Sequence, residues 1–129
     1  MVLNSTKTKI MIFNKSAHYD FMPEIEMCPG KTLQVVEEYK ILGVIFSTDM
    51  KWTKYINFIC KRAYAQLWTL RRLKKLGADH KTLIDIYEKY VRSILEYAAP
   101  AWYPMVTAEN TADLERVQKC AYSIIFGPK

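Results

Sequence analysis

The chain has 129 residues, of which half are hydrophobic and a quarter are charged, with only four glycines and five prolines. This composition excludes a disordered chain, a collagen-like repeat and a linker-dominated array, and the length suffices for one domain or for two halves that share a core. The net charge of +6 favours a polyanionic partner or an anionic surface.

Short strands are predicted over the first third of the chain. An apolar run with β-branched residues predicts a strand at 9–13, and a loop is expected at 14–23. Polar and apolar residues alternate at 24–27, and the Cys-Pro-Gly-Lys sequence at 28–31 has proline and glycine at the second and third positions of a type II turn. This pattern predicts a hairpin whose second arm is 33–36.

An apolar stretch at 39–46 predicts one last strand. Gly43 lies at its middle, where it weakens the strand but permits another backbone to approach closely. After Ser47 the apolar residues recur at three- and four-residue steps, which is typical of helices. The change of period predicts that helices follow.

Three helices are predicted. The first has an apolar stripe over 52–73 and ends near Gly77, because glycine favours the end of a helix. Asp79 is suited to cap the second helix, and Thr107 opens the third. The residues expected to face inward are Leu83, Ile86, Tyr90, Ile94 and Tyr97 on the second helix and Leu114, Val117, Cys120, Ile124 and Ile125 on the third.

These elements predict an α+β fold. A small antiparallel sheet of three to four short strands is followed by a three-helix, thumb-like bundle. We expect two domains, a β part at 1–47 and a helical part at 48–129.

The positive charge is concentrated on the first predicted helix. Between Met50 and Ala78 there are eight basic residues and no acidic residue, whereas the rest of the chain has eleven basic and thirteen acidic residues. At about 100° per residue, four of these cations fall on the face opposite the apolar stripe, and three aromatic residues lie on or beside that face. The cations are Lys54, Lys61, Arg72 and Lys75, and the rings are Phe58, Tyr64 and Trp68.

A basic face with interleaved rings suits nucleic acid, because cations contact phosphates and rings stack on sugars or bases. Two alternatives stay open. The charges can form a solvated face while the rings pack on a neighbouring element, or the helix can lie on a membrane surface, which is disfavoured because its apolar stripe is needed for the core. The residues predicted to contact nucleic acid are Lys51, Lys54, Lys61, Arg62, Arg71, Arg72, Lys75 and Trp68.

The sequence contains no self-sufficient active site. The acidic pairs are not placed to converge on a divalent ion, and the glycines are isolated, so no phosphate-binding loop is expected. The three cysteines and two histidines lack the spacing of a zinc site, and the odd number of cysteines favours a reducing, intracellular compartment. No apolar stretch is long enough to span a bilayer. We therefore predict no catalytic residue, no metal ligand and no membrane partner.

Five stretches in the same order along the chain share a pattern with one known family. They are 3–13, which includes Asn-x-x-Lys-Thr, 39–46, 52–73, 87–97 followed by Pro-Ala-Trp, and 114–119. They resemble reverse transcriptases of non-LTR (LINE-like, jockey-type) retrotransposons. The first is similar to the segment just after the catalytic carboxylates, the second to the primer-grip strand, and the others to the thumb and the region beyond it.

The resemblance implies RNA-templated DNA synthesis by a two-metal palm. The family's Tyr-x-Asp-Asp turn does not occur in this sequence. The expected protein is therefore the C-terminal palm edge plus the thumb of a truncated element, with no cofactor of its own, since the divalent magnesium would belong to the missing palm. The expected partners are an RNA/DNA primer–template duplex and the missing fingers and palm, and the expected location is the nucleus.

The resemblance also implies roles for residues of the β part. Lys7 matches the lysine near the leaving pyrophosphate and is the one auxiliary catalytic candidate, with a solvated strand-end lysine as the alternative. Leu42, Gly43 and Val44 match the primer grip, with a strand bend against the first helix as the alternative. For the whole chain, the rival function is a non-catalytic helical module for protein interaction or structure, and an active enzyme is a third option.

Overall fold

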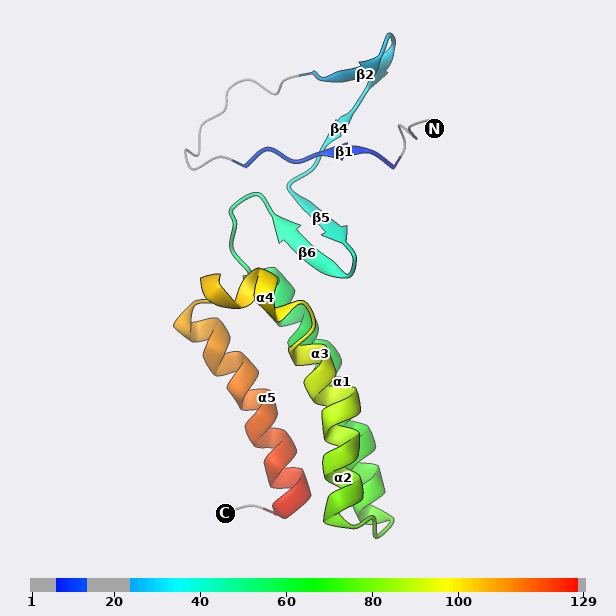
Figure 1. The fold of residues 1–129 in the computed structure, drawn as a ribbon, viewed down its shortest axis with the longest axis vertical. Coiled ribbons are helices and arrows are strands. Elements are labelled where there is room, and N and C mark those ends of the chain that lie inside the picture. Colours follow the sequence, from blue (N-terminus) through cyan, green and yellow to red (C-terminus); the bar gives the residue numbers. More distant parts are fainter. Residues whose placement is uncertain (1–6, 14–23, 128–129) are drawn as a thin grey trace. The chain divides into compact units, whose positions relative to one another are not determined.

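The computed structural model describes residues 7–13 and 24–127, which belong to two compact units, one ending at Lys51 and the other beginning at Trp52 (Figure 1). Short strands make up the first unit and helices the second, so the predicted α+β class is confirmed. The loop expected at 14–23 lies outside the described residues. None of the described helices is both long and apolar enough to cross a membrane.

In the described part of the first unit, the strands pair in three two-stranded sheets. The pairs β2–β3 and β5–β6 are antiparallel, whereas β1–β4 is parallel. The bounds are β1 Lys9–Ile10, β2 Glu26–Cys28, β3 Lys31–Thr32, β4 Gln34–Val35, β5 Glu38–Ile41 and β6 Val44–Ser47.

Residues 31–36 have two different strand partners, which is why the expected single antiparallel sheet is not formed. The hairpin partner of β2 is β3, at 31–32, rather than the predicted arm at 33–36, although the amide of Leu33 donates to the carbonyl oxygen of Ile25 over 3.0 Å. The predicted arm instead contains β4, which pairs in parallel with β1, and the amide of Val36 donates to the carbonyl oxygen of Ile10 over 2.8 Å. The turn itself is confirmed, because Cys28 pairs with Lys31 and Gly30 has the positive φ of 82° that a type II turn requires.

The prediction of one continuous strand at 39–46 is wrong. The segment is a hairpin, in which Ile41 pairs with Val44 and only Leu42 and Gly43 form the loop. Both loop residues have positive φ, 49° and 86°, as a two-residue type I′ turn demands. A leucine in this left-handed region costs about 1–2 kcal/mol, and its side chain is 86% exposed.

The first helix of the second unit, α1 (Thr53–Lys75), matches its prediction. Its apolar stripe is buried, and it ends at Leu76 before Gly77, whose φ is 86°. The fully buried members of the stripe are Ile56, Ala63, Leu67 and Leu70, with Ile59 2% exposed.

The second predicted helix is continuous but changes type. It consists of α2 (His80–Ile86), the π-helical segment η1 (Tyr87–Arg92) and α3 (Ser93–Leu95). Its buried stripe is Leu83, Tyr87, Val91 and Leu95, whereas Tyr90 and Tyr97, which we expected to face inward, are more than half exposed. The wider π turn explains the difference, because it keeps residues four apart on one side of the helix.

The second helix is followed by a break in the helical structure, which contains a buried tryptophan. It contains α4 (Ala99–Trp102) and the short 3₁₀ helix η2 (Tyr103–Met105). The ring nitrogen of Trp102 donates to the carbonyl oxygen of Tyr97 over 2.8 Å, and the hydroxyl of Tyr55 on α1 donates to the same oxygen over 3.1 Å. Trp102 is 2% exposed, so its side chain belongs to the core of the helical unit.

The last helix, α5 (Ala108–Phe126), closes the bundle and lies beside α1 (Figure 1). Thr107 caps it as predicted, since its side-chain oxygen accepts a hydrogen bond from the amide of Asn110 over 3.3 Å. The side chain of Asn110 is buried and donates to Thr53 on α1 over 3.3 Å. Val117, Ala121 and Ile125 face the core.

Candidate nucleic-acid interface

One side of α1 presents cations and a tryptophan to solvent. We call Lys54, Lys61, Trp68, Arg72 and Lys75 the basic face. All five are exposed, Trp68 by 58% of its surface. They follow one another at steps of seven, seven, four and three residues, which keeps them on one side of a helix and away from the buried stripe.

The basic face carries charge that α1 itself does not neutralise. Residues 53–75 contain no aspartate or glutamate. Both arginines on the other helices have acidic partners nearby, because Arg92 pairs with Glu88 and Glu96 on its own helix, and Arg116 pairs with Asp113 on α5. A helix whose exposed charges are all of one sign produces a local positive potential that attracts a polyanion.

The three aromatic residues predicted on or beside the basic face differ in their surroundings. The guanidinium carbon of Arg72 lies 5.1 Å from the ring centroid of Trp68, which is a cation–π contact on the basic face. Phe58 is half-buried, and the guanidinium carbon of Arg62 lies 5.7 Å from the centroid of its ring. Both residues lie beside the basic face, on one flank of the helix. Tyr64 is 38% exposed and lies near α5, since burial, followed by the nearby Cys120 thiol of that helix, raises the pKa of its hydroxyl.

The other predicted contact residues do not all join the basic face. Arg71 is exposed at its border, where α1 approaches α5. Arg62 is exposed on the flank that carries Phe58. Lys51 is exposed but belongs to the first unit, where its amide donates to a carboxylate oxygen of Asp49 over 2.9 Å.

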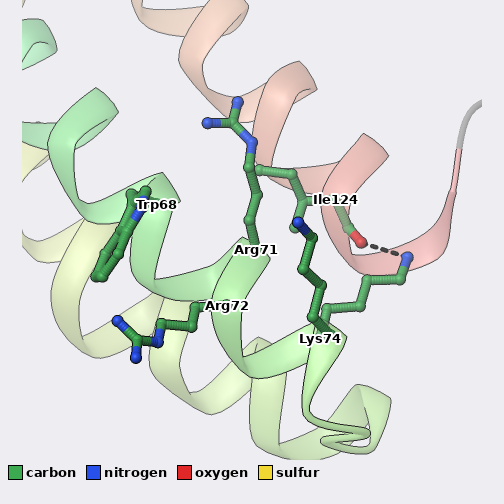
Figure 2. A pocket seen from close by; sticks show the side chains of 6 residues that line it. Trp68, Arg71, Arg72, Lys74 and Ile124 are labelled. Carbon is green, nitrogen blue, oxygen red and sulfur yellow. Dashed lines mark hydrogen bonds between the residues drawn. The ribbon is translucent and has the colours of Figure 1, made fainter.

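The last turns of α1 form a pocket of about 670 Å³ with α5. Trp68 and Arg72 lie on one side of it and Lys74 on the other, as Figure 2 shows. Among the described residues, no acidic side chain lines it. The lining residues are Trp68, Arg71, Arg72, Lys74, Lys75 and Ile124.

Lys74 has a role that the sequence interpretation missed. Its ammonium group donates to the carbonyl oxygens of Ile124 and Ile125, the latter over 3.2 Å (Figure 2). Lys74 therefore ties the end of α5 to α1. A signal existed in the sequence, because Lys74 follows Leu67 by seven residues and so falls on the apolar stripe rather than on the basic face.

The candidates of the first unit lie at two places. Lys7 is exposed, and its carbonyl oxygen accepts a hydrogen bond from the hydroxyl of Tyr39 over 3.2 Å. Leu42 and Gly43 form the tip of the β5–β6 hairpin, whereas Val44 is only 5% exposed. A contact by this hairpin would therefore use the side chain of Leu42 and the backbone of Gly43.

Cys60 and His80 of the second unit lie against other side chains of that unit. Burial, with a smaller effect of the Asp113 carboxylate, raises the pKa of Cys60 to about 11, which keeps this thiol protonated and a poor nucleophile at neutral pH. The ring of His80 lies 5.6 Å from that of Phe126. Within residues 7–13 and 24–127, no three His, Cys, Asp or Glu side chains gather where they could hold a metal ion.

Comparisons with protein-family models, with curated proteins and with solved structures find no match to this chain. The resemblance to reverse transcriptases therefore depends on the motifs of the sequence, and the proposal below depends on those motifs together with the geometry of α1.

Proposed function

We propose that this chain is the palm-edge and thumb portion of an RNA-directed DNA polymerase of a non-LTR retrotransposon, and that it holds the primer–template duplex on the basic face of α1. The observation that carries the proposal is the exposed row of cations around Trp68 on a helix without acids. The resemblance assigns this helix to the thumb.

The dimensions of α1 suit a duplex. Lys54 and Lys75 are separated by 21 residues, or roughly 32 Å along the helix axis at 1.5 Å per residue. This length is comparable to one turn of B-form DNA, about 34 Å, so the cations can reach several phosphates of a duplex in succession. Contacts of this kind fix position and carry no sequence preference, as a polymerase that copies any template requires.

The β5–β6 hairpin supports a second contact. Leu42 is held at positive φ and exposes 86% of its surface, so the chain bears backbone strain there without burying the side chain. Strained residues of this kind cluster at functional sites. The hairpin tip matches the primer grip in the resemblance, and in the proposal Leu42 and Gly43 contact the primer strand.

The chain binds nucleic acid in this proposal but does not polymerise. The two-metal reaction needs converging carboxylates, and the Tyr-x-Asp-Asp motif that supplies them in the family is absent from the 129 residues. Those carboxylates, and the magnesium ions that they hold, would come from a palm on another polypeptide segment. A nuclear location follows from the same proposal, because the family copies RNA into chromosomal DNA.

A salt titration with matched variants tests the proposal. The affinity for a blunt RNA·DNA hybrid is measured from 50 to about 300 mM salt for the native chain and for the triple variant Lys54→Ala, Lys61→Ala, Arg72→Ala. We expect the slope of log K against log salt to fall by about one for each cation removed. The control triple variant, Lys81→Ala, Lys89→Ala, Lys119→Ala, loses the same charge from exposed positions on other helices.

The control should keep most of the native slope. An unchanged slope in the α1 variant, or an equal loss in both variants, would contradict the proposal.

The rival function, a protein-interaction module, has one specific observation in its favour. Tyr122 and Phe126 on α5 are each more than half exposed, and their rings stack with centroids 6.3 Å apart. The His80 ring extends this aromatic surface from α2. An interaction module predicts self-association through these rings and an affinity for nucleic acid that is weak and insensitive to the charges of α1.

A further inference from the structure

The pocket at the end of α1 differs from the rest of the basic face, because it is concave and has a mixed lining. Cationic side chains surround an indole, and Ile124 of α5 adds an apolar wall. We propose that this pocket binds one unpaired nucleotide, with its base on Trp68 and its phosphate on Arg71 and Lys75. The inference rests on the proposed function and specifies which part of the nucleic acid binds at this end of α1.

The size and the ring of the pocket indicate a single base. A volume of about 670 Å³ is within the range of small-molecule sites, which includes a single nucleotide. Trp68 offers an exposed indole, and the guanidinium of Arg72 lies 5.1 Å from its centroid. An indole beside a guanidinium is a stacking surface for any of the four bases, since every base has a π face.

The charges of the pocket indicate a phosphate. Arg71, Arg72 and Lys75 line it, and none of the lining residues that the structure describes is acidic. Arginine presents a planar fork that matches phosphate oxygens, and lysine adds a compact cation. Lys74 does not belong to this group, because its ammonium binds the α5 carbonyl oxygens and so fixes Ile124 in the wall.

The position of the pocket indicates an unpaired nucleotide. Inside a duplex, both faces of each base are covered by their neighbours, so apart from the outer face of the terminal pair an indole can stack only on an unpaired base. The pocket shares Trp68, Arg72 and Lys75 with the basic face. It therefore lies at one end of the surface on which the duplex is proposed to bind. A strand that extends beyond the duplex at this end would place its first unpaired residue there.

Three RNA·DNA hybrids with the same duplex test the inference on the complete chain. One is blunt, one has an overhang of two adenine nucleotides, and one has an overhang of two abasic sites with the same charge. We expect the adenine overhang to bind at least fivefold more tightly than the abasic overhang, because base–aromatic stacking gives an effect of this order. Trp68→Leu should remove this difference, and Trp68→Phe should keep part of it.

Equal affinities for the adenine and abasic overhangs, or an undiminished difference in Trp68→Leu, would overturn the inference. If the blunt hybrid nevertheless binds with the expected salt slope, the proposed function stands without the pocket.

A mononucleotide tests the pocket without the duplex. Trp52 and Trp102 are buried, so quenching of the tryptophan fluorescence by adenosine monophosphate reports mainly on Trp68. We expect saturable quenching that is weakened several-fold by Arg71→Ala or Lys75→Ala, and much weaker binding of ribose 5-phosphate, measured by its competition. Saturable quenching without any binding of the hybrids would uphold the pocket and reject the proposed function. No saturable quenching, or equal competition by ribose phosphate, would reject the pocket.

Discussion

The ammonium group of Lys74 on α1 lies 3.2 Å from the carbonyl oxygen of Ile125 and also binds the carbonyl oxygen of Ile124 on α5. The last carbonyl groups of a helix have no partner within the helix and carry partial negative charge. Lys74 therefore stabilises the end of α5, whereas its neighbour Lys75 extends from the basic face. Of these two adjacent lysines, Lys74 therefore has a structural role and Lys75 is available to bind a ligand.

Lys74→Met should lower the free energy of unfolding by about 1 kcal/mol, because it removes a charge-assisted hydrogen bond to the end of α5. Lys75→Met is the matched control and should change stability by less than about 0.5 kcal/mol, since it alters an exposed side chain. Urea unfolding followed by circular dichroism measures both. Equal losses in the two variants would show that Lys74 is an ordinary surface lysine.

Leu42→Asn should stabilise the β5–β6 hairpin by about 1 kcal/mol. Asparagine tolerates positive φ, and Asn-Gly is the preferred pair for a two-residue type I′ turn. Amide hydrogen exchange of the two strands measures the effect. Leu42→Ala is the control, because it shortens the side chain but keeps the strain, so its strand amides should not gain protection.

The same variant separates stability from binding. If Leu42 contacts the primer, Leu42→Asn should weaken the binding of the hybrid even though the hairpin is more stable. A variant that is more stable and binds with undiminished affinity would remove Leu42 from the proposed interface.

Cys60 makes stability depend on alkaline pH. Burial raises the pKa of its thiol from an ordinary 9.0 to about 11, so between these values the unfolded chain loses the proton and the folded chain keeps it. The contribution is therefore complete below pH 9 and is lost as the pH rises toward 11. A shift from 9.0 to about 11 corresponds to about 3 kcal/mol.

Urea unfolding under reducing conditions at pH 8 and pH 10.5 checks this expectation. The native chain should lose more stability across this interval than Cys60→Ala. A loss remains in the variant, because burial also raises the pKa values of Tyr55 and Tyr87. Identical losses in the two proteins would contradict the assignment to Cys60.

The main features of α1 could be predicted from the sequence, for a physical reason. A stripe at three- and four-residue steps, a run without proline and a glycine after the last turn all favour the same helix. The exposure of the cations follows from that stripe, since a helix that buries one side must present the other. The positions of the basic face could therefore be predicted from the helical rotation of about 100° per residue alone.

Other features depended on interactions that the pattern does not reveal. The sequence at 39–46 reads as one strand, because Leu42 is an unusual residue for positive φ and hides the turn. The π turn at Tyr87–Arg92 shifts the buried stripe of the second helix by one residue, to Tyr87 and Val91. The pocket beside Trp68 needs Ile124 from α5, so it exists only after α1 and α5 have packed together.

The central claim is that nucleic acid binds to the basic face of α1, and amide chemical-shift mapping tests it most directly. The labelled chain is titrated with a blunt RNA·DNA hybrid and the shifted residues are assigned. We predict that the largest shifts in the helical unit occur at Lys54, Lys61, Trp68, Arg72 and Lys75, and that they decrease as salt is added. Shifts concentrated instead at Tyr122 and Phe126, or no shifts at all, would contradict the account.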